Sequence, residues 1–320
     1  MTVPVIISCD PGIDDAVALA LAFGSPKLDV LAVAATAGNV SLEVASANAT
    51  ALLDLLGVSP EFPVYLGSVG PLAGGIRVPD EPVHGKGGLG GVRLPPSTRS
   101  VEPGAVEHLA RLILSRPGEI TVLALGPLTD VARMFTDYPE TIAAIHRLVI
   151  MGGAVFSQGN YTLSAEFNFY ADPEAAAQVL EQGQRIDLVP VDVTRKTAVS
   201  RAMATELAGM PAPTGVFGSM LVNMCDNMVS RGRPDVAVMH DALAAAAVMD
   251  PGLIIWQDAT ATVELDGTLT RGAVVADVRG VSGRPVNLRY GSDVLVGPFL
   301  EMLTEHLSGL CQTIEKATTS

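Results

Sequence analysis

The chain has 320 residues, of which 48% are hydrophobic and 17% charged, so it can bury a sizeable core. Its 20 basic and 34 acidic residues give a net charge of −14, which argues against nucleic acid or an anionic membrane as a partner. The three cysteines are scattered, and the first apolar run stops at Asp10 without a basic leader. These features predict a cytoplasmic protein with free thiols, no signal peptide and no transmembrane span.

The first 190 residues alternate short apolar runs with segments of helical periodicity. The expected strands are Val3–Ser8, Leu28–Ala35, Ile120–Leu125, Leu148–Met151 and Ile186–Pro190. The expected helices are Ala16–Phe23, Leu42–Leu56, Ala105–Ser115, Leu128–Phe135 and Pro173–Glu181. Because the strands are apolar throughout, they predict a doubly wound, mostly parallel α/β sheet flanked by helices.

The pattern changes after Val191. The expected helices there are Ser200–Ala208, Val216–Ser230, Asp241–Val248 and Val294–Leu307, and the expected strands are Leu253–Leu265, Ala273–Val278 and Val286–Tyr290. The stretch Pro71–Ser100 is irregular and glycine-rich, as in functional lids or mobile loops. Because no linker or repeat divides the chain, we expect residues 1–320 to form a single domain.

The most informative segment places Asp10, Asp14 and Asp15 where the first strand gives way to a helix. Three carboxylates so close together repel one another unless a cation lies between them, and oxygen ligands favour Ca²⁺ or Mg²⁺. The alternative is an Asp cap and a carboxylate at the helix dipole. The additional carboxylate at the end of the strand favours a metal or polar-substrate site.

Two further positions follow strands at the same edge of the predicted sheet. Asn39 supplies an amide there, although a helix cap or turn explains it equally well. Leu125 precedes Gly-Pro, which leaves its carbonyl free to act as a neutral metal ligand. A strand-to-helix turn with proline at the first helical position is the alternative.

Two polar clusters come later in the chain. Asn160, Glu166 and Asn168 offer donors and acceptors suited to sugar hydroxyls, and the last two share a side of an expected extended segment. The alternative is a polar surface loop. His240 and Asp241 open an alanine-rich helix, where a capping Asp beside a structural His is the alternative.

Together these segments resemble the nucleoside hydrolase family, the inosine-uridine preferring nucleoside N-ribohydrolases. The motifs that carry the resemblance are Asp10-Pro-Gly-Ile-Asp14-Asp15-Ala, Ala37-Gly38-Asn39, Val83-His84-Gly85, Gly126-Pro-Leu-Thr, Met151-Gly-Gly, Glu166-Phe-Asn168 and His240-Asp241. They follow the family's order over nearly the full chain. The opening motif, Glu166-Phe-Asn168 and His240-Asp241 are specific, whereas the glycine-rich pieces alone are not.

The resemblance implies Ca²⁺-dependent hydrolysis of the N-glycosidic bond of ribonucleosides to ribose and free base by a homodimer or homotetramer. The implied metal ligands are the carboxylates of Asp10, Asp15 and Asp241 and the carbonyl of Leu125. The implied substrate-binding residues are Asp14, Asn39, Met151, Asn160, Glu166, Asn168 and Asp241, with His84 on a mobile loop over the base and His240 beside it.

The chemistry of these residues fits that reaction. Cleavage passes through an oxocarbenium-like ribosyl cation, which carboxylates and amide oxygens stabilise. Asp10 is the expected general base that activates a metal-bound water, and His240, with a pKa near neutrality, is expected to protonate the departing base. One general base acting on water predicts inversion at the anomeric carbon.

Base preference depends on weaker signals. The only tryptophan, Trp256, is badly placed for stacking on a purine, so His84 and His240 favour a pyrimidine or a broad inosine-uridine preference. The segment Val216–Arg233, with Asn223, Asp226, Asn227 and Arg231, is expected to line the base pocket. Ser8 and Lys86 replace the acidic residues that are usual at those places in the family.

Two rival functions remain open at this point. A Mg²⁺-dependent phosphatase with Asp10 as nucleophile would need a basic residue near the phosphate, and neither the aspartate cluster nor the Glu166/Asn168 segment supplies one. A catalytically silent ribonucleoside-binding protein would keep the pocket but lose Asp10 or the metal ligands, and all of these are present.

Overall fold

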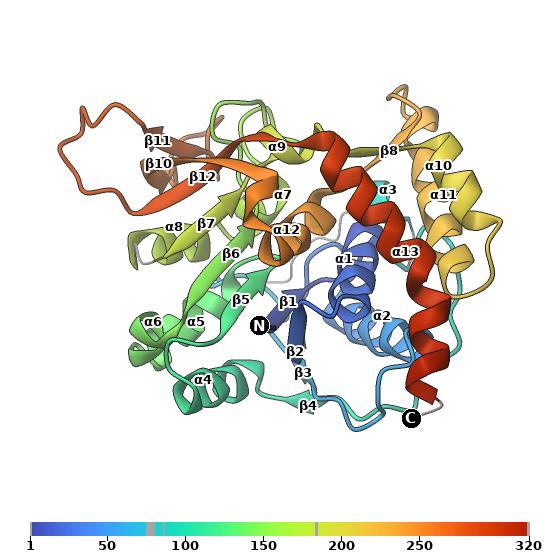
Figure 1. The fold of residues 1–320 in the computed structure, drawn as a ribbon. Helices are drawn as coiled ribbons and strands as arrows, with labels where there is room; N and C mark the ends of the chain where they lie inside the picture. The colour runs from blue at the N-terminus through green and yellow to red at the C-terminus, as the bar shows by residue number, and fades with distance from the viewer. Residues whose placement is uncertain (1, 75–80, 86, 183–184, 319–320) are drawn as a thin grey trace.

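The computed structural model describes residues 2–74, 81–85, 87–182 and 185–318 (Figure 1). Lys86 lies outside these residues. Within the described part, ten strands form one sheet. Their order is β11 (Val274–Asp277), β10 (Ile254–Val263), β12 (Leu288–Val294), β7 (Ile186–Val189), β6 (Arg147–Met151), β5 (Thr121–Ala124), β1 (Val3–Cys9), β2 (Leu28–Ala35), β3 (Val64–Leu66) and β4 (Glu102–Pro103).

Neighbouring strands from β12 to β4 are parallel, and only β10 runs against its neighbours β12 and β11 in the described sheet. Strand β1 shows why both faces are covered, since Val5 and Ile7 belong to one apolar core and Ile6 to the other. A strand without a polar face has to be buried on both sides. The predicted doubly wound, mostly parallel α/β sheet is confirmed.

Helices pack on both faces of the sheet (Figure 1). One core includes α1 (Ile13–Gly24), α2 (Leu42–Leu55), α10 (Arg201–Ala208), α11 (Thr214–Ser230), α12 (His240–Met249) and α13 (Val296–Thr318). The other includes α4 (Ala105–Ser115), α5 (Thr129–Asp137), α6 (Glu140–Ala144) and α8 (Pro173–Gln182). No helix in the described part of the chain combines the length and apolar content that a bilayer crossing requires.

The winding of the sheet reverses at β1. This strand lies between β5 and β2, so the chain continues outward to β4 on one side and later from β5 to β7 on the other. In such sheets a crevice opens beyond the carboxyl ends of the strands at the reversal point. The aspartate-rich turn that follows Cys9 lies at this point.

Short elements are the main difference from the sequence predictions. The structure adds β3, β4 and a separate antiparallel pair, β8 (Ala198–Ser200) with β9 (Val236–Val238). It also adds α3 (Glu81–His84), α7 (Phe167–Ala171), α9 (Val191–Thr194) and the 3₁₀ turn Pro251–Leu253. Elements of two to five residues show too few periods for periodicity to reveal them, and β5, β6 and β7, which are equally short, were found through their continuous apolar runs. Val294, expected to open the last helix, instead ends β12.

Candidate active site

The first turn of α1 gathers several of the predicted site residues. Gly12 is the N-cap, and its N–H donates to Asp15 Oδ2 at 2.9 Å, which is the Asp15 half of a capping box. The next N–H, of Ile13, donates to His84 Nδ1 at 3.1 Å. The capping interpretation therefore holds for Asp15 in part, but it does not account for Asp14 or Asp10.

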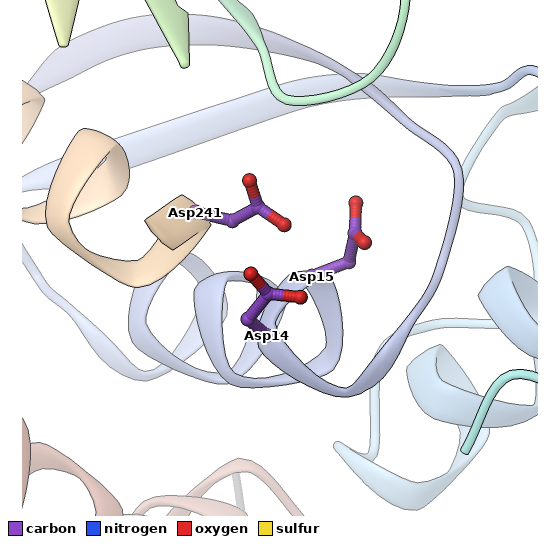
Figure 2. Close-up of side chains that lie close together, drawn as sticks. All are labelled: Asp14, Asp15 and Asp241. Atoms are coloured by element: carbon purple, nitrogen blue, oxygen red, sulfur yellow. The ribbon is translucent and has the colours of Figure 1, made fainter. Parts of the chain in front are cut away.

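Three carboxylates from two helices meet above this turn. Asp14 and Asp15 from α1 and Asp241 from α12 each offer an oxygen atom within 4.8 Å of the others (Figure 2). They are 4%, 0% and 3% exposed. Burial raises the pKa of Asp14 and of Asp15 to about 6. Burial, followed by repulsion from Asp14 and Asp15, raises the pKa of Asp241.

This arrangement fits a hard divalent cation. Buried carboxylates at such spacing are stable in the ionised form only when positive charge offsets their desolvation and mutual repulsion. Asp14 Oδ1 is buried and has no hydrogen-bond partner among the described residues. An all-oxygen donor set with such an available atom is typical of Ca²⁺ or Mg²⁺ sites.

Asp10 lies behind the cluster, fully buried at the end of β1. Its Oδ2 accepts a 2.6 Å hydrogen bond from the backbone N–H of Asn39. A β-carbon built on Gly38 would lie 1.9 Å from Asp10 Oδ2, and one built on Gly126 would lie 2.6 Å from Oδ1. The carboxylate thus occupies space that only glycine leaves free on both sides. The structure groups Asp14, rather than Asp10, most closely with Asp15 and Asp241.

Two of the capping alternatives are wrong. Helix α2 is capped by Ser41, and the Asn39 side chain instead donates to Asp15 Oδ2 at 3.1 Å. Helix α12 has Met239 at its N-cap, and Asp241 lies inside the first turn with its carboxylate in the cluster. Neither Asn39 nor Asp241 is a helix cap, and the side chains of both belong to the site around Asp15.

Glu166 caps the short helix α7. Its Oε1 accepts from the N–H of Asn168 at 2.9 Å, and its Oε2 accepts from the N–H groups of Gly153 at 2.9 Å and Phe169 at 3.2 Å. The extended segment expected for Glu166 and Asn168 is wrong because this carboxylate satisfies the first N–H groups of a helix. Burial raises the pKa of Glu166 to about 7, against the lowering effect of these hydrogen bonds.

Asn168 links the ends of two central strands. Its Nδ2 donates to the carbonyl of Leu125 at 2.6 Å and to that of Met151 at 3.2 Å. Asn168 is 4% exposed and Glu166 2%, so the surface-loop alternative is wrong for both. Asn160 is exposed, and its Oδ1 accepts from the N–H of Phe167 at 2.9 Å.

His240 opens α12 with its Nδ1 2.6 Å from Thr194 Oγ1. Burial, followed by the positive charge of Arg195 and of His84, lowers the pKa of His240 to about 3. The expected near-neutral pKa is therefore wrong, because desolvation and a nearby arginine disfavour the imidazolium cation. The imidazole is neutral at physiological pH.

These residues surround a cavity of about 530 Å³. The predicted residues that line it are Asp14, Asn39, His84, Leu125, Met151, Asn160, Glu166, Asn168, His240 and Asp241. Asp10 and Asp15, both fully buried, are not in this lining. The structure therefore brings ten predicted residues, some more than 200 positions apart, to one cavity.

The segment expected to line the base pocket does so in part, because Arg231 is the one of its four named residues that lines the cavity. Met224 and Met228 of α11 line the cavity together with Arg231 and Arg233. Asn223 and Asp226 do not, because α11 turns them elsewhere. Asp226 pairs with Arg201 at 2.7 Å.

Asn227 is outside the lining too, since its Nδ2 donates to the carbonyl of Val83 at 2.6 Å. Arg195, Tyr161 and Phe167 also line the cavity and were not predicted from the sequence. The four-residue spacing of Met224 and Met228 on one helix face was a signal for this missed pair, whereas nothing local singled out Arg195 or Arg233.

Comparison with known proteins agrees with this geometry. The family model described as inosine-uridine preferring nucleoside hydrolase matches residues 5–301. The pyrimidine-specific ribonucleoside hydrolase RihA of Salmonella newport (strain SL254) is 34% identical over 310 residues, which cover 96% of this chain and 99% of RihA.

Solved structures show the same fold. A purine-preferring ribonucleoside hydrolase from Gardnerella vaginalis superposes with a TM-score of 0.90 at 27% identity, covering 96% of this chain and 98% of its own. The plant nucleoside hydrolase PpNRh1 gives 0.89 at 28% identity, with 96% and 99% covered. The chain therefore belongs to the inosine-uridine preferring nucleoside hydrolase family and is a hydrolase that acts on the N-glycosyl bonds of nucleosides.

Proposed function

We propose that this enzyme hydrolyses pyrimidine ribonucleosides to ribose and free base and uses Ca²⁺ as its cofactor. The observation that carries the proposal is the meeting of three buried carboxylates at a cavity of about 530 Å³ lined by Glu166 and Asn168. This volume is within the usual range for small-molecule sites, roughly 300 to 1,000 Å³. A carboxylate-rich floor suits a sugar whose ring becomes positively charged during the reaction.

The proposed metal ligands are the carboxylates of Asp10, Asp15 and Asp241 and the carbonyl of Leu125. The cluster supports two of these ligands, Asp15 and Asp241, and Asp14 beside them is left to meet a ribose hydroxyl. A bound Ca²⁺ would neutralise these carboxylates and acidify a coordinated water.

Each side chain at the site has a separate role in the proposed hydrolysis. Asp10, held by the N–H of Asn39, takes the proton from the attacking water as general base. Glu166 and Asp14 offer negative charge to the developing ribosyl cation, and Asn168 donates hydrogen bonds that position the strand ends around it. His240 faces the departing base as a neutral imidazole and donates a hydrogen bond to it, and the base takes up its proton from solvent water.

The preference for pyrimidines has two supports. The curated relative RihA, 34% identical, is named pyrimidine-specific. Trp256 lies on β10 outside the cavity lining, with the Arg289 guanidinium 4.7 Å from its ring centroid, so it does not stack on a base in the cavity. The more distant Gardnerella structure is named purine-preferring, so purine nucleosides belong in any test.

The test is a panel of uridine, cytidine, inosine and adenosine with added Ca²⁺, in which released ribose is measured as reducing sugar. We expect uridine or cytidine to give the highest kcat/KM, with turnover abolished by a chelator and reduced about 100-fold or more in Asp10→Ala. Proton NMR of the first-formed ribose should show inversion at the anomeric carbon. A protein that binds uridine and Ca²⁺ but releases no ribose from any nucleoside would be the silent binding protein instead.

Three further features belong to the same proposal. We propose a single domain over residues 1–320, a homodimer or homotetramer, and a cytoplasmic location. The family resemblance supports the oligomer, and the scattered cysteines support a reducing compartment.

A further inference from the structure

The cavity has an acidic floor and a basic rim. Its acidic lining residues, Asp14, Glu166 and Asp241, are between 2% and 4% exposed and form the floor. Its basic lining residues, Arg195, Arg231 and Arg233, are exposed and form the rim. Three arginines on one rim stand out in a chain with 20 basic and 34 acidic residues. A ligand with its ribose on the floor meets a cationic surface at its outer end.

Arg195 is held in a fixed orientation at this rim. It follows α9, and its two terminal nitrogens donate to the carbonyls of Gln158 and Gly159, each at 2.6 Å. A guanidinium has five N–H donors, so further donors remain for a ligand. Because the backbone already orders this side chain, binding a ligand costs little additional conformational entropy.

Arg233 lies on the connection between α11 and β9, and its backbone N–H donates to the carbonyl of Met228 at 2.9 Å. Its guanidinium has no hydrogen-bond or ion-pair partner among the residues that the structure describes. Burial lowers the pKa of Arg195, and the charge of Arg233 acts in the same direction against that of Asp192. The two cations are thus close enough to repel each other, and an anion between them would relieve that repulsion.

We propose that the rim of Arg195, Arg231 and Arg233 binds an anionic group of the substrate, so that the enzyme prefers ribonucleosides with a negative charge beyond the ribose diol. This inference rests on the proposed function and narrows its substrate class. Two sources supply the charge: a carboxylate on the pyrimidine ring or a phosphate on the 5′ carbon. The planar fork of arginine matches either group through paired hydrogen bonds.

The experiment compares substrates that differ in charge, and the two members of the first pair also have nearly the same shape. Two ratios of kcat/KM are measured: the ratio between 5-carboxyuridine and its neutral isostere 5-carbamoyluridine, and the ratio between uridine 5′-monophosphate and uridine. Both ratios are measured for the unmodified enzyme, for Arg233→Gln and for Arg233→Lys. Inherent differences in leaving-group reactivity cancel when the same ratio is compared between enzymes.

Arg111→Gln is the matched control, because this arginine is exposed on α4 and pairs only with Glu107 of its own helix in the described structure. We expect Arg233→Gln to lower one of the two ratios about tenfold, with partial recovery in Arg233→Lys and no change in Arg111→Gln. A fall in the first ratio assigns the rim to a base carboxylate, and a fall in the second assigns it to a 5′-phosphate. Added salt should weaken the preference, because the rim is exposed.

Ratios that are the same in the unmodified enzyme and in Arg233→Gln, with uridine hydrolysed, would overturn the inference and leave the proposed function standing. No ribose from uridine would contradict the proposed function itself. In that case, calorimetric titration of 5-carboxyuridine and uridine 5′-monophosphate into the two proteins still tests the rim. Equal affinities in both proteins would overturn it.

Discussion

Two glycines leave the space that the carboxylate of the proposed general base occupies. Asp10 is enclosed by Gly38 and Gly126, and the N–H of Asn39 fixes one of its oxygens at 2.6 Å. Neither glycine has a left-handed φ, so backbone freedom is not the reason for glycine at these positions. The reason is space for a carboxylate that has to lie deep in the molecule.

We therefore expect Gly38→Ala to lower kcat about 100-fold, since a displacement of about 1 Å at a reacting group costs that much. The new methyl group would lie 1.9 Å from Asp10 Oδ2, so the carboxylate must move. Ribose release from the best substrate measures kcat, and a thermal melt checks folding. Gly297→Ala is the control, because a β-carbon there meets nothing within 4 Å. A Gly38→Ala enzyme with the kcat of the control would contradict this account of Asp10.

Individual site residues could be predicted from the sequence where metal binding or catalysis requires a particular type of side chain. Asp10, Asp14 and Asp15 stood out because carboxylates so close together need a reason, and the structure places all three at the site. Arg195 and Arg233 did not stand out, because lone arginines are ordinary on a protein surface. Their significance depends on which residues lie across the cavity, which only the fold decides.

Among the secondary-structure elements, α7 depends most on a single side chain. This five-residue helix is too short to be stable alone, and Glu166 satisfies the N–H groups of Asn168 and Phe169 at its start. The same carboxylate accepts from Gly153 in the loop after β6. One residue therefore supports both the helix that presents Asn168 and the loop that lies beside it.

Replacing Glu166 by alanine should lower the free energy of unfolding by about 1 to 3 kcal/mol, because buried N–H groups lose their acceptor. It should also reduce kcat, since Asn168 loses its support. Denaturant unfolding measures the first effect and ribose release the second. Glu181→Ala, an exposed glutamate on α8, serves as the control. Equal stability of the two variants would show that the capping hydrogen bonds contribute little.

Element prediction succeeded for the long helices and for the strands with continuous apolar runs. The helices α1, α2, α4 and α8 and the strands β1, β2, β5, β6 and β7 were found with ends within a few residues. Helix α7 was mistaken for an extended segment because five residues cover little more than one turn. What identifies it is the Glu166 cap, a contact made only once β6 and the following loop are in place.

Over the whole molecule, the pKa shifts link stability to pH and to metal. In the metal-free protein, burial raises the pKa of Asp14 and Asp15 to about 6 and that of Glu166 to about 7. A folded-state pKa above the unfolded value means that the unfolded chain releases its proton first. These groups therefore lower the free energy of unfolding as pH rises from about 4 to 7.

Calcium should reverse this effect. Because the cation binds the ionised carboxylates of the folded protein, we expect Ca²⁺ to raise Tm more at pH 8 than at pH 5. Thermal melts at both pH values, with Ca²⁺ and with a chelator, make the comparison. Asp241→Asn should reduce the difference between the Ca²⁺-induced rise in Tm at pH 8 and that at pH 5. An equal Ca²⁺ effect at both pH values would mean that these carboxylates are not the ligands.

The architecture as a whole was the most predictable level. Apolar strands alternating with helices indicated a parallel sheet, and a parallel sheet places its ligand at the carboxyl ends of its strands. The position of β1 between β5 and β2 was beyond the sequence pattern, because strand order depends on long-range packing. That order places the turn after β1, with its carboxylates, at the point where the winding of the sheet reverses.

The glycine walls around Asp10 also bear on how a silent relative of this enzyme could be recognised. A chain that keeps every carboxylate, but has alanine or a larger residue at position 38 or 126, could still capture a cation and a sugar. The Asp10 carboxylate would nonetheless be displaced from its position beside the reacting water. Glycine at positions 38 and 126 therefore distinguishes an active enzyme from a silent relative, although glycine has no functional group of its own.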